Sequence, residues 1–275
     1  MDTFIQQIIN GLVLGSMYAL VALGYTMVYG VLNLINFAHG DVLMIGAMVG
    51  LTILKVLDAV APGLPGYVDL AIAIAGAIPA CMIVNVIIER IAYRRLRNAP
   101  RLAPLITAIG VSILLQTFAM MIWGRSPLPF PQLLATEPIT VGGAVISQTQ
   151  LLLLVLAALA MFGLVVLVEK TKMGRAMRAV AENPRVAGLM GVDSNKVIVA
   201  TFAIGAALAA VAGVMWAANY GTVQHSMGFL PGLKAFTAAV FGGIGNLAGA
   251  MLGGVLLGLI EALGAGYIGA LTNGV

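Results

Sequence analysis

The chain has 275 residues, of which 61% are hydrophobic and 9% are charged, and its net charge is +4. A soluble domain carries about 25% charged residues, so this composition excludes an ordinary soluble protein and predicts an integral membrane protein. The apolar runs are continuous instead of alternating, which favours spanning helices over the strands of a transmembrane barrel. The positive charge does not indicate nucleic-acid binding, because most of the cations are confined to two loops.

The first apolar run, residues 4–31, is long enough to cross a membrane. A secretory signal peptide begins with a positively charged region, but the first Lys or Arg of this chain is Lys55. A cleaved signal peptide is therefore not expected, and the first run should remain in the protein as a span.

A polar segment, NLINFAHGD (33–41), follows the first span. It carries four polar or charged side chains, Asn33, Asn36, His39 and Asp41. One interpretation places the segment at membrane depth, where Gly40 breaks the helix and the four side chains belong to a translocation pathway. The other interpretation is a simple cytoplasmic turn. A lone His with one nearby Asp falls short of a metal site, so no metal is expected.

Six further apolar runs are candidate spans, the first of them short: 42–57, 69–92, 102–123, 148–169, 196–219 and 233–264. The last run is too long for one span and contains GGIGN (242–246), so we expect a short half-helix followed by a full one. The residues of this break that we assign to the pathway are Gly242, Gly243, Gly245 and Asn246. We expect Lys234 and Glu261 to lie at an interface or to pair internally, and Glu261 is also a candidate functional carboxylate.

Most of the cations lie in two clusters, Arg90, Arg94, Arg95, Arg97 and Arg101, and Lys170, Lys172, Arg175, Arg178, Arg185 and Lys196. The positive-inside rule places both clusters in the cytoplasm, which agrees with the two spans between them. Residues 124–147, with Pro127, Pro129, Pro131 and Pro138, then form an external loop. Counting three spans back from Arg90 puts the N-terminus outside.

The second cluster contains the segment AENPRVAGLMGVDSNKV (181–197). Asn183 is a good helix N-cap, Pro184 suits the first helical position, and Gly191 suits the left-handed residue that ends a helix. Asp193 or Ser194 would then cap the next span. We therefore expect a short cytoplasmic helix over 184–190. It could dock on a soluble partner, or it could be an interfacial helix with no partner.

Small residues recur every four positions in three spans, at Gly11 and Gly15, at Gly205, Ala209, Gly213 and Ala217, and at Gly254, Gly258, Ala262 and Gly266. This spacing allows close helix contacts in lipid, either as seams that shift during transport or as ordinary packing. The fold predicted is an all-α polytopic bundle with broken or re-entrant helices, forming one transmembrane domain over residues 1–275.

Several functional classes are disfavoured by what the sequence lacks. It has no G-x-x-x-x-G-K-[ST] motif for ATP hydrolysis, and its two histidines support no catalytic triad, so an enzyme is not expected. A stand-alone channel or a secondary transporter remains an alternative. A channel would not need the helix at 184–190. An ion-coupled carrier would more often have paired carboxylates inside the membrane, and the candidates for such carboxylates in this sequence are Asp41 and Glu261 alone.

Three segments resemble a known family, GLVLGSMYALVALGYTMVYGVLNLINFAHGDVLMIGA (11–47), ENPRVAGLMGVDSNKV (182–197) and FTAAVFGGIGNLAGAMLGG (236–254). They are similar to the LivH-type permeases of bacterial branched-chain amino-acid ABC importers, and the likeness covers nearly the whole chain. The third segment is shared with permeases for urea, amides and sugars, so import of urea or short amides is the close alternative.

The resemblance implies a subunit of the bacterial inner membrane with several partners. These are a second related permease, two ATPase subunits that bind ATP and Mg, and a periplasmic or lipid-anchored substrate-binding protein; this chain itself would bind no cofactor. The helix at 184–190 then resembles a coupling helix, with contacts carried by Arg175, Arg178, Glu182, Asn183, Pro184, Arg185 and Gly188. Family members usually continue into a further apolar span, whereas this chain ends at GYIGALTNGV, so that span is naturally absent or missing.

Overall fold

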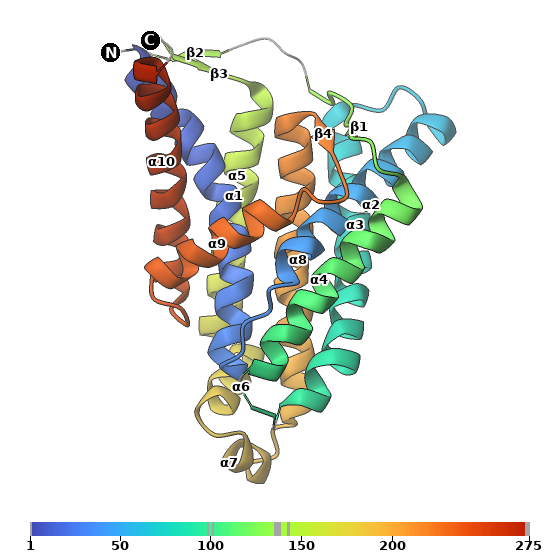
Figure 1. Cartoon of the computed structure of the whole chain (residues 1–275), viewed down its shortest axis with the longest axis vertical. Coiled ribbons are helices and arrows are strands. Elements are labelled where there is room, and N and C mark those ends of the chain that lie inside the picture. The colour runs from blue at the N-terminus through green and yellow to red at the C-terminus, as the bar shows by residue number, and fades with distance from the viewer. Residues whose placement is uncertain (1, 98, 101, 135–138, 142–143, 273–275) are drawn as a thin grey trace.

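The computed structural model describes the whole chain except residues 1, 98, 101, 135–138, 142–143 and 273–275. Two positions named above, Arg101 and Pro138, lie outside the described residues. Within the described part, seven helices are long and apolar enough to cross a membrane. The predicted all-α polytopic bundle is therefore confirmed (Figure 1).

The long helices are α1 (Asp2–Leu32), α2 (His39–Val60), α3 (Gly66–Ile88), α4 (Leu102–Trp123), α5 (Gln148–Lys170), α8 (Ser194–Tyr220) and α10 (Leu247–Thr272). The run predicted over 233–264 does divide, into the shorter α9 (Phe229–Phe241) and α10. α3 continues through a π-helical turn, η1 (Glu89–Tyr93), and a 3-10 turn, η2 (Arg94–Leu96).

Two short helices, α6 (Lys172–Glu182) and α7 (Pro184–Leu189), follow α5. α7 was predicted from the sequence, whereas the residues of α6 were recognised only as a group of cations. α6 is amphipathic, because Gly174, Met177 and Val180 are buried while its charged side chains are exposed. This spacing of one buried residue every three positions was the signal that could have revealed it.

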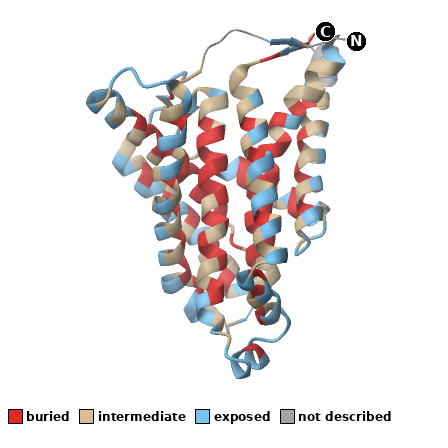
Figure 2. Cartoon of the chain, turned by 180° about the vertical axis from the view of Figure 1, so that it is seen from behind, coloured by how far each residue is buried: buried red, intermediate tan, exposed pale blue. Residues whose placement is uncertain are grey.

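α6 and α7 lie at one end of the bundle, and α1 begins and α10 ends at the other (Figure 1). The described residues of both cation clusters lie at the α7 end, because Arg97 of the first cluster contacts Asn195 at the start of α8. The positive-inside rule makes this end cytoplasmic and puts the N-terminus outside, as predicted. Figure 2 shows buried residues in the middle of the bundle and exposed ones on its outer faces and at the α7 end.

The predicted external loop 124–147 carries short strands that sequence analysis did not foresee. β1 (Leu128–Pro129) pairs antiparallel with β4 (Thr222–Val223), and β2 (Ile139–Val141) pairs antiparallel with β3 (Ala144–Ile146). Gln6 of α1 exchanges two hydrogen bonds, of 2.9 and 2.7 Å, with the backbone of Val145. The external loop is therefore fastened to the start of α1 through β3 and to the segment after α8 through β1.

The most extensive helix contact joins α1 and α10, which run antiparallel. A Cβ on Gly258 would lie 2.3 Å from the Cα of Gly15, and a Cβ on Gly11 would lie 2.8 Å from the Cα of Leu259. Glycine is required here because backbone lies against backbone. The small residues predicted at helix contacts in both spans therefore do form a seam.

Residues 33–38 re-enter the bundle after α1 instead of forming a cytoplasmic turn, and α2 begins at mid-depth (Figure 1). The His39 ring lies against Gly205, which is eleven residues into α8 and so about 16 Å along its axis. The segment thus lies at depth in the bundle, as one of the two interpretations predicted. Gly40 does not break the helix, however: it lies inside α2, and the break falls at 33–38. The role of the segment in a pathway stays a prediction.

Asn36 anchors this re-entrant segment. Its Oδ1 accepts hydrogen bonds from the Tyr93 hydroxyl at 2.9 Å and from the Ala38 backbone at 3.1 Å. Its Nδ2 donates to Asn85 at 3.5 Å, and Asn85 donates to the Phe202 carbonyl at 2.7 Å. One buried asparagine therefore links the unwound backbone to α3, η1 and α8, which supplies partners for polar groups that lipid could not satisfy.

The α1–α10 seam leads to a first prediction. Gly258→Leu should lower the free energy of unfolding by about 1–3 kcal/mol, because the new side chain must separate the two backbones. Gly264→Leu on the same helix is the matched control, since no atom of another described element lies within 4 Å of a Cβ at Gly264. Thermal unfolding in detergent, followed by tryptophan fluorescence, measures both. Equal melting temperatures for the two variants would contradict the seam.

A second prediction concerns the Asn36 anchor. Tyr93→Phe should cost about 1 kcal/mol of stability, and Asn36→Ala should cost more, because it leaves the Tyr93 hydroxyl and the Ala38 N–H without a partner. In the Asn36→Ala background, Tyr93→Phe should cost little or nothing. Tyr67→Phe, at a tyrosine that is 62% exposed, is the control. If the stability losses of Asn36→Ala and Tyr93→Phe simply add in the double variant, the hydrogen bond between Asn36 and Tyr93 does not stabilise the protein.

Candidate functional site

The polar segment places three of its four predicted pathway residues inside the protein. Asn36, His39 and Asp41 are each no more than 1% exposed. Asn33 is exposed and ends α1 with a left-handed φ of 52°, so it lies apart from the other three. The segment therefore contributes a buried cluster and one separate residue at the cytoplasmic end of α1.

His39 sits in a close-fitting apolar slot. A Cβ on Gly24 would lie 2.1 Å from its Nε2, and Tyr25 meets its ring edge-on at a centroid distance of 5.0 Å. Neither ring nitrogen has a hydrogen-bond partner among the described residues. The His39 ring therefore packs flat between α1 and α8, and the protein shields it completely from solvent.

A hydrogen bond from Gln116 joins Asp41 to the wall of a large outer cavity. The Nε2 of Gln116, on α4, donates to Oδ1 of Asp41 at 3.0 Å. Gln116 also lines a cavity of about 870 Å³ between α1, α4, α8, α9 and α10, which we call the outer cavity. Asp41 thus lies behind the wall of this cavity, and Gln116 separates the carboxylate from its interior.

The outer cavity combines aromatic walls with a few polar groups. Three aromatic rings of its wall stack in sequence, with Tyr18–Trp216 and Trp216–Tyr220 centroids 5.9 and 4.8 Å apart. Polar side chains come from the chain that descends to α9, namely Thr222, Gln224 and Ser226. Such a mixture, mostly apolar with a few placed polar groups, is typical of a small-molecule site.

An ion pair faces the outer cavity. Lys234 of α9 and Glu261 of α10 approach to 2.5 Å, and the Tyr18 hydroxyl donates to the second Glu261 oxygen at 3.0 Å. The expectation that these two ionisable residues pair internally is therefore confirmed. The sequence did not indicate that the pair would meet Tyr18 at a cavity, because that contact joins positions 243 residues apart.

The GGIGN break forms a tight turn between α9 and α10 near the cytoplasmic end. Gly243 and Gly245 have φ of 88° and 98°, values that favour glycine, and Asn246 accepts a hydrogen bond from the Gly249 N–H. Gly242 ends α9. The predicted pathway residues of this turn therefore lie apart from the buried cluster around Asp41, and their role in the pathway stays a prediction.

A second cavity, of about 430 Å³, brings the GGIGN turn next to a predicted coupling residue. We call it the inner cavity; it is lined by Gly245 and Asn246 of the turn, by Arg178 of α6, and by residues at the ends of α1 and α5. Arg178 donates at 2.5 Å to the Val168 carbonyl near the end of α5. α6 is thus bonded to the cytoplasmic end of α5 and faces the turn between α9 and α10 across the inner cavity.

α7 projects from this end of the bundle with the caps that the sequence predicts. The Asn183 side chain accepts from the backbone N–H groups of Arg185 and Val186, at 3.0 and 3.2 Å. Gly191 has a φ of 83°. Glu182, Pro184 and the other predicted contact residues are exposed, as are three apolar side chains of α7 and its C-cap, Val186, Leu189 and Met190.

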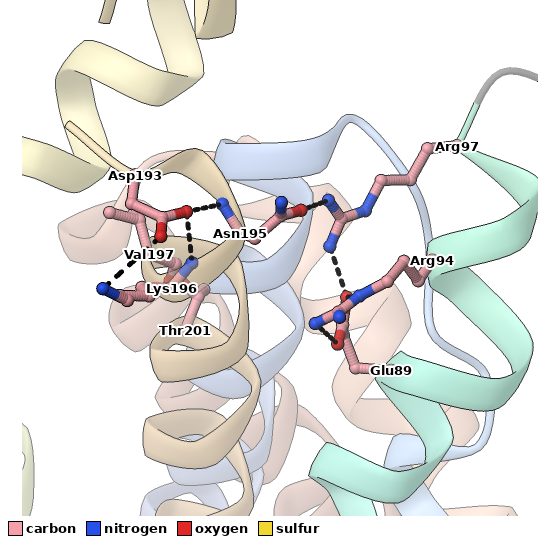
Figure 3. A network of polar contacts seen from close by, with 8 residues as sticks. All are labelled: Glu89, Arg94, Arg97, Asp193, Asn195, Lys196, Val197 and Thr201. Carbon is pink, nitrogen blue, oxygen red and sulfur yellow. Dashed lines mark hydrogen bonds and ion pairs between the residues drawn. The ribbon is translucent and has the colours of Figure 1, made fainter. Parts of the chain in front are cut away.

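A polar network joins the exit of α7 to α3 (Figure 3). Asn195, at the start of α8, accepts from Arg97 at 2.7 Å, and Arg97 and Arg94 both pair with the fully buried Glu89. From the sequence, these arginines indicated only the orientation of the chain in the membrane. A buried carboxylate needs such partners, so the network fixes the cytoplasmic ends of α3 and α8 relative to each other.

Asp193 caps α8 within the same network (Figure 3). The backbone N–H of Lys196, joined by that of Asn195, holds the pKa of the Asp193 carboxyl below its usual range. Because this pKa is lower in the folded state than in the unfolded state, the Asp193 cap stabilises the fold fully at pH values above the ordinary pKa of Asp. That contribution is lost only as the pH falls through the lower, folded-state pKa. The cap therefore stays ionised at physiological pH.

Within the described residues, no group of three or more His, Cys, Asp or Glu side chains is arranged to hold a metal ion. The chemistry available at the two cavities is that of binding: paired charges, hydroxyls and amides on an apolar frame. The arrangement can hold a small solute, and the irregular backbone of its two broken helices lines or adjoins a cavity.

Comparison with known proteins places this architecture in a family. The sequence profile described as "Branched-chain amino acid transport system / permease component" matches residues 7–274. The permease BraD of the Pseudomonas aeruginosa high-affinity branched-chain amino acid transport system is 46% identical over 274 residues, which cover 97% of this chain and 88% of BraD. The corresponding LivH of Escherichia coli K12 is 44% identical over 270 residues, covering 96% of this chain and 87% of LivH.

A relative of lower sequence identity also aligns over most of this chain. The probable branched-chain amino acid permease LivH of Methanocaldococcus jannaschii is 29% identical over 274 residues, which cover 94% of this chain and 80% of that protein. Seven helices within the described residues are able to span a membrane, so the predicted multi-pass membrane protein is confirmed, and the matches confirm the predicted LivH-type resemblance. The chain belongs to the branched-chain amino acid transport system permease family.

Proposed function

We propose that this chain is the permease subunit of an ABC importer that carries branched-chain amino acids across the inner membrane. Its partners in the proposal are a second related permease, two cytoplasmic ATPase subunits that bind ATP and Mg, and an external substrate-binding protein. Membership of the family supports the transport role. The substrate is that printed in the names of BraD and LivH, transferred here as part of the proposal.

The observation that carries the coupling to an ATPase is the shape of α7. Leu189 is 87% exposed and Met190 is 80% exposed, at the tip of a helix that is capped at its start and projects beyond the bundle. Exposed apolar side chains at a rigid tip favour insertion into a groove of a soluble partner. A stand-alone channel has no use for such a helix.

Two connections could transmit movement of α7 to the broken helices. The Ser194 hydroxyl donates to the Pro184 carbonyl at 3.2 Å, which ties the start of α7 to the start of α8. On the other side, Arg178 of α6 lines the inner cavity together with the GGIGN turn. A rigid displacement of α6 and α7 would therefore act on α8 and on the turn between α9 and α10.

Co-purification and transport together test the proposal. The chain is purified in mild detergent from its native membrane, and associated proteins are identified by mass spectrometry. Recovery of an ATPase and a second permease is expected, and the reconstituted complex should take up leucine in an ATP-dependent manner. Uptake of urea or acetamide instead of leucine would favour the alternative substrate class, and recovery of the chain alone from intact complexes would favour a channel or carrier.

A third prediction concerns the tip of α7. Leu189→Asp should abolish most association with the ATPase subunits, because a carboxylate would replace an apolar side chain that the groove is expected to bury. Leu64→Asp, in the turn between α2 and α3 at the other end of the bundle, is the matched control. Pull-down of the ATPase with each variant measures the effect. Equal recovery from both would contradict docking through α7.

A fourth prediction concerns the polar residues beside that tip. Arg185→Ala and Glu182→Ala should each lower binding-protein-stimulated ATP hydrolysis while substrate capture by the external protein is unchanged, because both side chains are exposed on the side expected to meet the ATPase. Steady-state ATPase assays in proteoliposomes measure the loss. Unchanged ATPase and transport rates in both variants would argue against the coupling role.

A further inference from the structure

We propose that Lys234, Glu261 and Tyr18 form a binding site for the charged head group of a zwitterionic α-amino acid in the outer cavity. The inference rests on the proposed function, because it assumes that the transported solute is an amino acid. It assigns to this chain a substrate contact of its own, in addition to whatever the external binding protein provides.

The first argument is the position of the ion pair. The Lys234 and Glu261 side chains are 43% and 34% exposed, and both line the outer cavity. Ionisable side chains within spanning segments are costly, and they usually face a pathway or a polar cavity. At this position both charges are open to the 870 Å³ cavity and can be reached by a solute inside it.

The second argument is chemical complementarity. An α-amino acid carries a carboxylate and an ammonium group on one carbon, and the ion pair offers a cation and an anion side by side. The substrate carboxylate would bind Lys234, and its ammonium would bind Glu261, each through a charge-assisted hydrogen bond. The two protein charges would then remain neutralised whether or not the substrate is bound. Urea or a simple amide offers neither charge.

The third argument is that the surroundings set an orientation. The first turn of α9, Phe229 to Pro231, lines the same cavity, and the N-terminal end of a helix favours negative charge. The carboxylate is therefore favoured on the α9 side, and the ammonium is favoured on the α10 side near the Tyr18 hydroxyl. Trp216 and Met227 supply apolar wall against which an aliphatic side chain can pack.

The test uses the whole complex, with permeases, ATPases and binding protein in proteoliposomes, and radiolabelled leucine. Lys234→Gln and Glu261→Gln should each lower leucine uptake about ten-fold, the loss expected for one charge-assisted hydrogen bond, while binding-protein-stimulated ATP hydrolysis persists. Lys55→Gln and Asp58→Asn, which replace the same kinds of charge at a different external cavity, should transport normally. Tyr18→Phe, which keeps the ring and removes only the hydroxyl, should give a smaller loss.

A charge exchange separates substrate binding from a structural role. If the pair only holds two helices together, Lys234→Glu combined with Glu261→Lys should restore uptake. If it binds substrate, the exchanged charges oppose the orientation set by α9, and uptake should stay low. Direct leucine binding to the complex without binding protein should be displaced by isoleucine, but not by 4-methylpentanoate or 3-methylbutylamine, which lack one of the two charges.

The outcomes separate this inference from the proposed function. If the wild-type complex imports leucine and the two Gln variants import it equally well, or if the exchanged pair restores uptake, the site is overturned and the importer stands. If the wild-type complex imports no branched-chain amino acid, the proposed function fails, and the head-group site fails with it. Low uptake with retained ATP hydrolysis in both Gln variants and in the exchanged pair supports the site.

Discussion

The rest of the structure depends on one backbone contact in the middle of the bundle, where the start of α2 meets the start of α9. A Cβ on Gly40 would lie 2.6 Å from the Gly228 carbonyl oxygen, and a Cβ on Gly228 would lie 2.1 Å from that of Gly40. Side chains at these positions would force the two helix starts apart. The Asp41–Gln116 hydrogen bond and the wall of the outer cavity, which includes Phe229, both adjoin this contact.

The contact joins two interrupted segments that run in opposite directions (Figure 1). After α1 the chain re-enters from the cytoplasmic end and starts α2, whereas after α8 it re-enters from the outer end and starts α9. Along α1, Tyr18 lines the outer cavity and Thr26 lines the inner cavity, with Gly24 packed against His39 between them. The crossing of the two segments therefore divides the interior into an outer and an inner compartment, an arrangement that resembles the broken-helix organisation of other transporters.

The spans and the caps of α7 were predictable because each depends on a local pattern. Apolar length defined the spans, and Asn183, Pro184 and Gly191 marked the ends of a short helix with residues that suit those positions. The depth of residues 33–38 was not predictable, because a polar turn and a polar re-entrant segment look alike in sequence. What distinguishes them is distant: Tyr93 is 57 residues from Asn36, and Phe202 is 117 residues from Asn85. The contact of Tyr18 with the Lys234–Glu261 pair escaped prediction for the same reason.

The two helix breaks differ in how firmly they are held, and this difference bears on how the bundle could move. The break at 33–38 is anchored by the hydrogen bonds of Asn36, which is 1% exposed, so moving it would leave buried polar groups unpaired. The break at 242–246 has exposed residues, two glycines with positive φ, and the inner cavity beside it. Local stability is lowest where buried contacts are fewest. We therefore expect the GGIGN turn, which adjoins α6, to absorb a displacement that begins at α7, while the Asn36 anchor keeps the first half of the bundle fixed.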